Sequence, residues 1–114
     1  MKPKDRLYLS NIYEAILKIE NYTQGGRQAF MAIPIIQDAV IRNFEIIGEA
    51  TKRLSDELRQ ENVDIHWRQM AGLRDVLIHD YMQVKLSRVW EIIEQALPTL
   101  KQQVKVLLKE YESE

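Results

Sequence analysis

The chain has 114 residues, a length that predicts one domain with a single modest core. Hydrophobic residues make up 46% of it and charged residues 29%, which is typical of a soluble globular protein and excludes a disordered chain. The absence of cysteine excludes disulfides, thiolate metal ligands and a cysteine nucleophile. The formal net charge of -1 excludes a protein that coats nucleic acid through general basicity, so any RNA or DNA contact must be local.

The sequence also limits where the protein can be located and which metal or phosphate sites it can form. No apolar run approaches the roughly 18 residues that a membrane span needs. The N-terminal MKPKDRLYLS has basic residues but no apolar stretch behind them, so we expect no signal peptide and a cytoplasmic location. The two histidines, His66 and His79, do not have metal-ligand spacing with the scattered carboxylates. The sequence also has no Gly-rich phosphate loop.

The first half of the chain predicts two long helices. A first helix is expected near Asp5 to Glu20, because its apolar residues recur at helical spacing. Gly25-Gly26 should end it, and a short helical turn over 29–33 should follow. A second helix is expected from Pro34, which suits a first helical turn, to about Leu58. The polar residues 59–65 then predict a connection.

The second half predicts a third helix from Ile65 or His66 and a long last helix. The last helix carries apolar residues that alternate spacings of four and three, as in a packed heptad seam. Pro98 lies within this pattern without breaking its phase, so we expect a kink rather than a stop. Together the elements predict an all-α fold, an up-and-down bundle of four to five helices. The heptad residues are Leu86, Trp90, Ile93, Leu97, Leu100, Val104, Leu107 and Tyr111.

The stretch RDVLIHDY, residues 74–81, places an arginine on an apolar face. On a helical wheel Arg74 falls at the middle of an apolar arc, where an unpaired guanidinium would be very costly. It could pair with Glu45 or Glu49 of the second helix. It could instead face a cleft or a symmetric partner and wait for a phosphate, which suits its planar fork. The spacing leaves both alternatives open.

His79 lies on a different side of the same helix. It is about 140° from Arg74 and shares a face with Arg68, Gly72 and Asp75. The carboxylate of Asp75, four residues before His79, could hold one imidazole nitrogen and fix the tautomer. An ideal helix cannot direct Arg74 and His79 at one phosphate. Either the helix deforms near Ile78 or the site is assembled across a two-fold axis.

Arg74, His79 and Tyr81 form the pattern R-x4-H-x-Y, which resembles the motif of HepT-like ribonuclease toxins of the HEPN family. The similarity also covers QDAVIRNFEIIGEATKRLS from Gln37, IHWRQMAGLRDVLIHDY from Ile65 and VWEIIEQALPTLKQQV from Val89, so it spans most of the chain. The bare R-x4-H pattern is weak, but the ordered set of blocks is specific.

The resemblance implies a homodimeric HEPN bundle over residues 1–114 that acts as a metal-independent endoribonuclease without a cofactor. It implies catalytic roles for Arg74 and His79 at a composite dimer site, with Asp75 in support. It also implies a type II toxin–antitoxin pair with a small nucleotidyltransferase antitoxin. That antitoxin would use ATP to transfer AMP onto Tyr81, a type VII-like silencing. Transfer RNA is a candidate substrate by family analogy.

Two other interpretations remain open at this point. The chain could be a non-catalytic helical partner whose 74–81 face binds the nucleotidyltransferase, an alternative that the acidic balance slightly favours. It could also be a bundle in which Arg74 only neutralises an internal carboxylate. Lys101, Lys105 and Lys109 form a C-terminal basic row at four-residue spacing, which we interpret as a solvated helix face.

Overall fold

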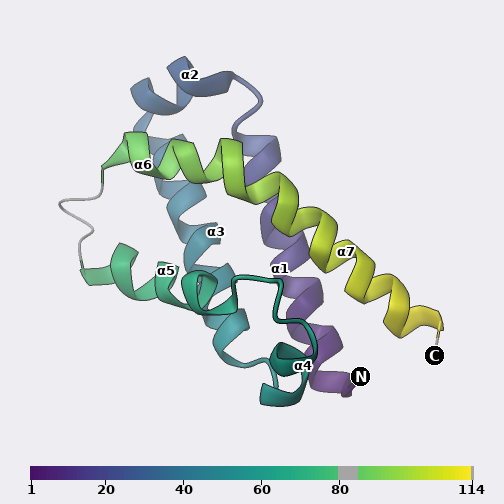
Figure 1. Ribbon diagram of the computed structural model, residues 1–114. Helices are drawn as coiled ribbons and strands as arrows, with labels where there is room; N and C mark the ends of the chain where they lie inside the picture. Colours follow the sequence, from purple (N-terminus) through teal and green to yellow (C-terminus); the bar gives the residue numbers. More distant parts are fainter. Residues whose placement is uncertain (80–84, 114) are drawn as a thin grey trace.

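Helices account for the regular structure of the chain in the computed structural model, which describes residues 1–79 and 85–113 and has no strand among them (Figure 1). The all-helical prediction is therefore confirmed. The two long early helices pack against each other, a third crosses beside them, and the last part of the chain forms a long rod along one side. The elements are α1 (Pro3–Tyr22), α2 (Gly26–Ala32), α3 (Pro34–Lys52), α4 (Asp56–Glu61), α5 (Trp67–His79), α6 (Leu86–Glu91), η2 (Ile92–Ala96) and α7 (Leu97–Ser113).

The core lies where α3 meets α1 on one side and α5 on the other. Both α1 and α3 begin with a proline, whose missing N–H would be unpaired in the first turn of a helix in any case. The side chains with almost no exposed surface come mainly from these two helices, and their burial is the main driving force for folding. They include Leu9, Ile12, Ile16, Ile19, Val40, Phe44 and Ile47.

The predicted break after the first helix is a two-glycine turn. Gly26 has a φ of 84°, a left-handed conformation that only glycine adopts without strain. Glycine is required at position 25 for another reason: any larger residue would place a Cβ only 2.9 Å from the Cβ of Ala29. The turn starts α2, whose Phe30 is fully buried and lies 5.5 Å from Trp90, measured between ring centroids.

The predicted extent of the second helix is wrong at its end. It stops at Lys52 rather than near Leu58, and a separate helix, α4, covers part of the predicted 59–65 connection. The cause is Ser55, whose hydroxyl oxygen accepts a hydrogen bond from the Leu58 backbone N–H at 3.1 Å and so caps α4. Leu54 and Leu58 are nevertheless both buried. The apolar pattern therefore predicted their burial correctly, although it did not predict the end of the helix.

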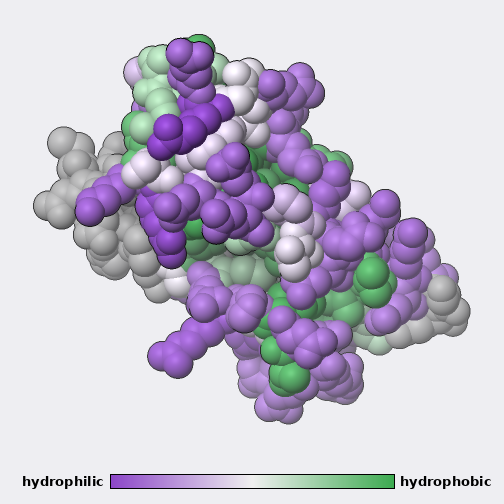
Figure 2. Space-filling model, turned by 45° about the horizontal axis from the view of Figure 1, so that its top comes forward, coloured by the Kyte–Doolittle hydropathy of each residue, from purple (hydrophilic) through white to green (hydrophobic). Residues whose placement is uncertain are grey.

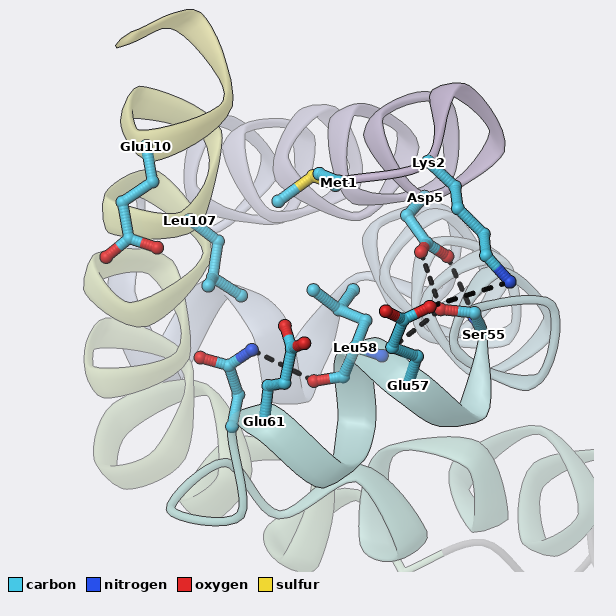
Figure 3. A pocket seen from close by; sticks show the side chains of 10 residues that line it. Met1, Lys2, Asp5, Ser55, Glu57, Leu58, Glu61, Leu107 and Glu110 are labelled. Atoms are coloured by element: carbon cyan, nitrogen blue, oxygen red, sulfur yellow. Dashed lines mark hydrogen bonds and ion pairs between the residues drawn. The ribbon is translucent and has the colours of Figure 1, made fainter. Parts of the chain in front are cut away.

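A buried carboxylate ties this corner to the start of the chain. Asp5 in the first turn of α1 is only 1% exposed. Its two oxygens accept hydrogen bonds from the Ser55 backbone N–H at 2.8 Å and the Ser55 hydroxyl at 2.6 Å (Figure 3). The Ser55 hydroxyl therefore donates to Asp5 while it accepts from α4. One connected set of hydrogen bonds fixes α1, the end of α3 and the start of α4.

The long last helix is continuous, but Pro98 changes its winding. Residues 92–96 form a π-helical segment, η2, in which the Leu97 backbone N–H donates to the Ile92 carbonyl five residues earlier. A proline ring clashes with the carbonyl four residues before it, and a wider turn relieves that clash. The rod bends between α6 and α7 (Figure 1). The predicted kink is thus present, but it lies just before Pro98.

The heptad stripe of this rod is its packed side, as predicted. Trp90, Ile93, Leu97, Val104 and Leu107 are buried. The remaining members of the stripe are half-buried. Near the end of α7, the guanidinium of Arg6 makes a cation–π contact with Tyr111, and its Cζ atom lies 5.2 Å from the ring centroid.

We predict that Asp5→Ala lowers the free energy of unfolding by about 3 kcal/mol, because it leaves two buried donors of Ser55 without an acceptor. Urea unfolding followed by circular dichroism measures this. The matched control is Asp56→Ala on the same corner, where the side chain is 86% exposed and the change should stay below about 1 kcal/mol. Equal effects of the two substitutions would contradict the structural role of Asp5.

The glycines give a second prediction for stability. Gly26→Ala should cost about 1–2 kcal/mol, because alanine must adopt a positive φ there. Gly72→Ala in the interior of α5 should instead stabilise the protein by up to about 1 kcal/mol, because a Cβ there has room. Thermal melts of both variants check the opposite signs. A Gly26→Ala variant as stable as the original chain would contradict the interpretation of the turn.

Candidate functional site

Helix α5 carries the residues that the sequence singled out. It runs without interruption from Trp67 to His79, so the backbone positions of Arg74, Asp75 and His79 all lie on it. The side chains of residues 74–79 lie outside the described part of the structure. Tyr81 lies outside the described residues altogether, within 80–84.

The continuity of α5 bears on how the site can be assembled. The sequence offered two alternatives, a helix deformed near Ile78 or a site shared across a two-fold axis. Because α5 remains α-helical through Ile78 to His79, Arg74 and His79 differ by about 140° in direction around one axis. One α5 helix of this form places the two residues on different faces.

The N-terminal half of α5 is firmly anchored. Trp67 and Met70 are buried, and α5 packs against α3. The Trp67 indole N–H donates to the Asn62 carbonyl at 2.9 Å, which holds the preceding turn to the helix. By register, Arg74 follows Trp67 and Met70 on the face whose described residues are buried. This confirms that Trp67 is a core residue, while the place of Arg74 on a largely apolar face stays a prediction.

The opposite face of α5 is polar and open. Arg68 is exposed, and Gly72 lies one turn further along. A Cβ built at Gly72 would meet no heavy atom within 4 Å. Glycine inside a helix is usually explained by a neighbour that packs closely. Gly72 has no such neighbour, so packing against the described residues does not explain it.

The two carboxylates proposed as partners of Arg74 contact other arginines. Glu45 lies 3.6 Å from Arg42, and Glu49 lies 3.3 Å from Arg53, measured between the closest oxygen and nitrogen atoms. These residues line a shallow hollow of about 320 Å³ between α1 and α3, beside Tyr8. Interactions with Tyr8 and then with Glu49 raise the pKa of the Arg53 guanidinium above its ordinary value. A pair with Arg74 falls outside the described residues.

A second hollow, of about 360 Å³, lies at the end of the molecule that holds the N-terminus (Figure 3). Leu58 and Leu107 form its apolar part, while Glu57, Glu61 and Glu110 supply carboxylates. The one lysine of its lining, Lys2, lies 3.8 Å from Glu57. This concentration of negative charge repels a polynucleotide, so the hollow is no candidate for binding RNA.

The face seen in Figure 2 is largely hydrophilic, with smaller hydrophobic areas between the hydrophilic ones. Lys101 of the C-terminal basic row lies 3.0 Å from Glu20 of α1, and this contact raises the pKa of its ammonium group. Lys105 and Lys109 are exposed, which agrees with the interpretation of that row as a solvated helix face, whereas Lys101 is half-buried. Among the side chains that the structure describes, those of residues 1–73 and 85–112, no three His, Asp or Glu are placed to hold a metal ion. Within the same residues, no helix is long and apolar enough to cross a membrane.

Comparison with known proteins identifies the chain as a family member. The family model described as "Ribonuclease HepT-like" matches residues 12–107. A Thermococcus cleftensis protein named as a probable ribonuclease HepT is 38% identical over 96% of this chain and its whole length. A Caldanaerobacter subterraneus protein named as a candidate RNase is 38% identical over 91% of this chain and 94% of its own.

A further relative is longer than this chain. A Methanocaldococcus jannaschii protein, named as a gamma-glutamylcyclotransferase and candidate RNase, is 39% identical over 96% of this chain. The chain spans half the length of that protein. No solved structure matches the chain. The helical fold, the R-x4-H pattern on α5 and these comparisons agree, and the chain therefore belongs to the HepT-like family of ribonucleases.

Proposed function

We propose that this protein is a metal-independent endoribonuclease toxin that acts as a homodimer and is silenced by a nucleotidyltransferase antitoxin. The observation that carries the proposal is the family match over residues 12–107, which includes Arg74 and His79 on α5 and the adjoining Tyr81. The names of the relatives support RNA as the substrate class.

The chemistry follows from the RNA backbone itself. The 2′-OH attacks the neighbouring phosphorus, the bond from phosphorus to the 5′ oxygen breaks, and a 2′,3′-cyclic phosphate forms. A proton must leave the 2′-OH and another must reach the departing 5′ oxygen. His79 moves protons near neutral pH, Asp75 orients its imidazole, and Arg74 stabilises the charge that develops on the phosphate. These steps need no metal ion.

A dimer accounts for the direction of the two catalytic side chains. On an uninterrupted α5 helix, the positions of Arg74 and His79 lie about 140° apart around the axis, so one helix alone would not direct both residues at a single phosphate. Two α5 helices related by a two-fold axis can bring Arg74 of one copy toward His79 of the other. A cleft at that interface also gives Arg74, on its largely apolar face, an anion to bind.

The antitoxin would act at Tyr81. Tyr81 is seven residues from Arg74, about two helical turns, a spacing that would put both on one side if the helical register continued. Transfer of AMP from ATP to the tyrosine oxygen would release pyrophosphate and place a bulky anion beside Arg74. The nucleotide then blocks RNA by its size and by its charge.

The first test is cleavage of RNA by the purified protein with a chelator present. Wild type should give 2′,3′-cyclic phosphate ends, and His79→Ala should be at least about 100-fold slower, because a positioned acid–base group contributes that much or more. The chain offers a matched control in His66→Ala, an exposed histidine directly before α5. It should cleave at the wild-type rate.

The same experiment distinguishes the second candidate function, favoured only by the net charge of -1. A folded, unmodified protein that cleaves no RNA, together with a His79→Ala variant that binds the nucleotidyltransferase more weakly, would replace the ribonuclease proposal by a non-catalytic partner role. Cleavage that stops when chelator is added would contradict the metal-independent mechanism.

A further prediction concerns Tyr81. After incubation with the antitoxin and ATP, wild type should gain the mass of AMP and lose cleavage, whereas Tyr81→Phe should stay unmodified and active. Tyr22→Phe, a tyrosine that is 36% exposed on α1, is the control and should behave like wild type. A fully modified protein that still cleaves RNA at the original rate would disprove silencing by this route.

A further inference from the structure

Among the described residues, two features of α5 have no explanation within a single chain, and they adjoin each other. The first is Gly72, a half-buried glycine in the interior of a helix, beside which space is open. Since glycine weakens a helix, an interior glycine points to a close approach by another group. Nothing in the described part of the chain makes that approach, which leaves the space beside Gly72 open to an external group.

The second feature is the guanidinium of Arg68, one turn before Gly72. Most described arginines are neutralised by a neighbouring carboxylate, namely Arg42, Arg53, Arg59 and Arg88. Arg6 lies over the ring of Tyr111. Arg68 is exposed and makes no ion pair with any residue of the described part, including Asp64 four positions earlier. In a protein with a net charge of -1, Arg68 is available to an external anion, and among the described arginines it shares this property with Arg27 of α2.

Register places both features on the same face as His79. Arg68, Gly72, Asp75 and His79 follow one another at spacings of four, three and four, within an arc of about 60°. Every residue type in this row is polar or glycine. A partner α5 that brings Arg74 toward His79 reaches one end of this row, whereas the Arg68 end lacks the apolar neighbours expected at the charge-depleted centre of a protein interface. An anionic chain suits this face better.

We propose that Arg68 and the open surface over Gly72 form a subsite for the RNA backbone, separate from the phosphate that is cleaved. This inference rests on the proposed ribonuclease function and specifies how it binds its substrate. Arg68 is eleven residues from His79, roughly 16 Å along the helix axis, so it grips a phosphate outside the one that reacts. Because Gly72 has no side chain, the RNA strand can lie against the helix between Arg68 and His79.

The subsite implies a preference for a polynucleotide. A dinucleotide has a single phosphodiester, which cannot occupy the reacting position and reach Arg68 together. A longer strand makes both contacts. Arg68 is therefore a positioning residue, and its contribution belongs to substrate binding rather than to the chemical step.

The test compares Arg68→Ala with Arg27→Ala, another exposed arginine without a described carboxylate partner, which lies on α2. On an oligonucleotide, Arg68→Ala should raise KM about ten-fold and leave kcat within two-fold, as expected for the loss of one charge-assisted contact. On a dinucleotide it should match wild type. Arg27→Ala should match wild type on both. Equal KM values for the two variants on the oligonucleotide would overturn the subsite.

A binding measurement keeps this inference apart from the proposed function. Fluorescence anisotropy with a 2′-O-methyl oligonucleotide, which cannot be cleaved, reports binding without the chemical step. Arg68→Ala should bind more weakly, and its dependence on salt should fall by the equivalent of about one phosphate contact. If wild type cuts no RNA but shows this Arg68-dependent binding, the subsite stands and the ribonuclease proposal fails. If wild type does not bind the oligonucleotide, the subsite fails as well.

A second variant, Gly72→Leu, tests the open surface without removing a charge. Leucine is a good helix former and the space is free, so the fold should persist by circular dichroism. RNA binding should fall while the oligomeric state measured by sedimentation stays unchanged. Unchanged RNA binding with a lost dimer would assign Gly72 to contact with a second copy and overturn the RNA subsite. Weaker binding of the nucleotidyltransferase by Arg68→Ala, with RNA affinity intact, would equally overturn it.

Discussion

The arrangement of this bundle depends on one buried carboxylate. Asp5 is almost completely buried, and both of its carboxylate oxygens accept hydrogen bonds from Ser55, fifty residues away in the chain. A carboxylate taken out of water is stable only with such complete hydrogen bonding. The contact fixes where α3 stops and where α4 starts. The short α4 then sets the direction from which the chain enters α5, the helix that carries the candidate site.

Much of the fold could be predicted because it is periodic. The stripe on the last helix follows from spacings of three and four, and its members are the residues that the structure buries or half-buries. The end of α3 could not be predicted from that pattern, since Leu54 and Leu58 keep helical phase across the break. The overlooked signal was local: Ser55 followed by Asp56 and Glu57 is typical of a capped helix start. The bond from Asp5 to Ser55 is non-local, and no spacing rule reveals it.

The candidate site was predictable in part. Periodicity alone places Arg74 and His79 on different faces of one helix, about 140° apart. The uninterrupted α5 has the regular helical geometry that this angle assumes. The roles of the two residues come from resemblance, because spacing left the arginine between two explanations. Gly72 and Arg68 were visible in the sequence as neighbours of His79. Only the three-dimensional surroundings show that one has open space beside it and that the other lacks a described carboxylate partner.

The packing of α7 against α1 has a consequence for how the chain folds during synthesis. Helix α1 buries its apolar residues against α3 and α7, and Arg6 meets Tyr111 near the opposite end of the sequence. Helix α1 leaves the ribosome before α7 and therefore keeps one apolar side uncovered until α7 has emerged. Contacts between such distant segments are slow to form, and the exposed side is meanwhile prone to association. Rapid pairing of α1 with α3, which needs only the short α2 between them, limits that exposure to the α7 side.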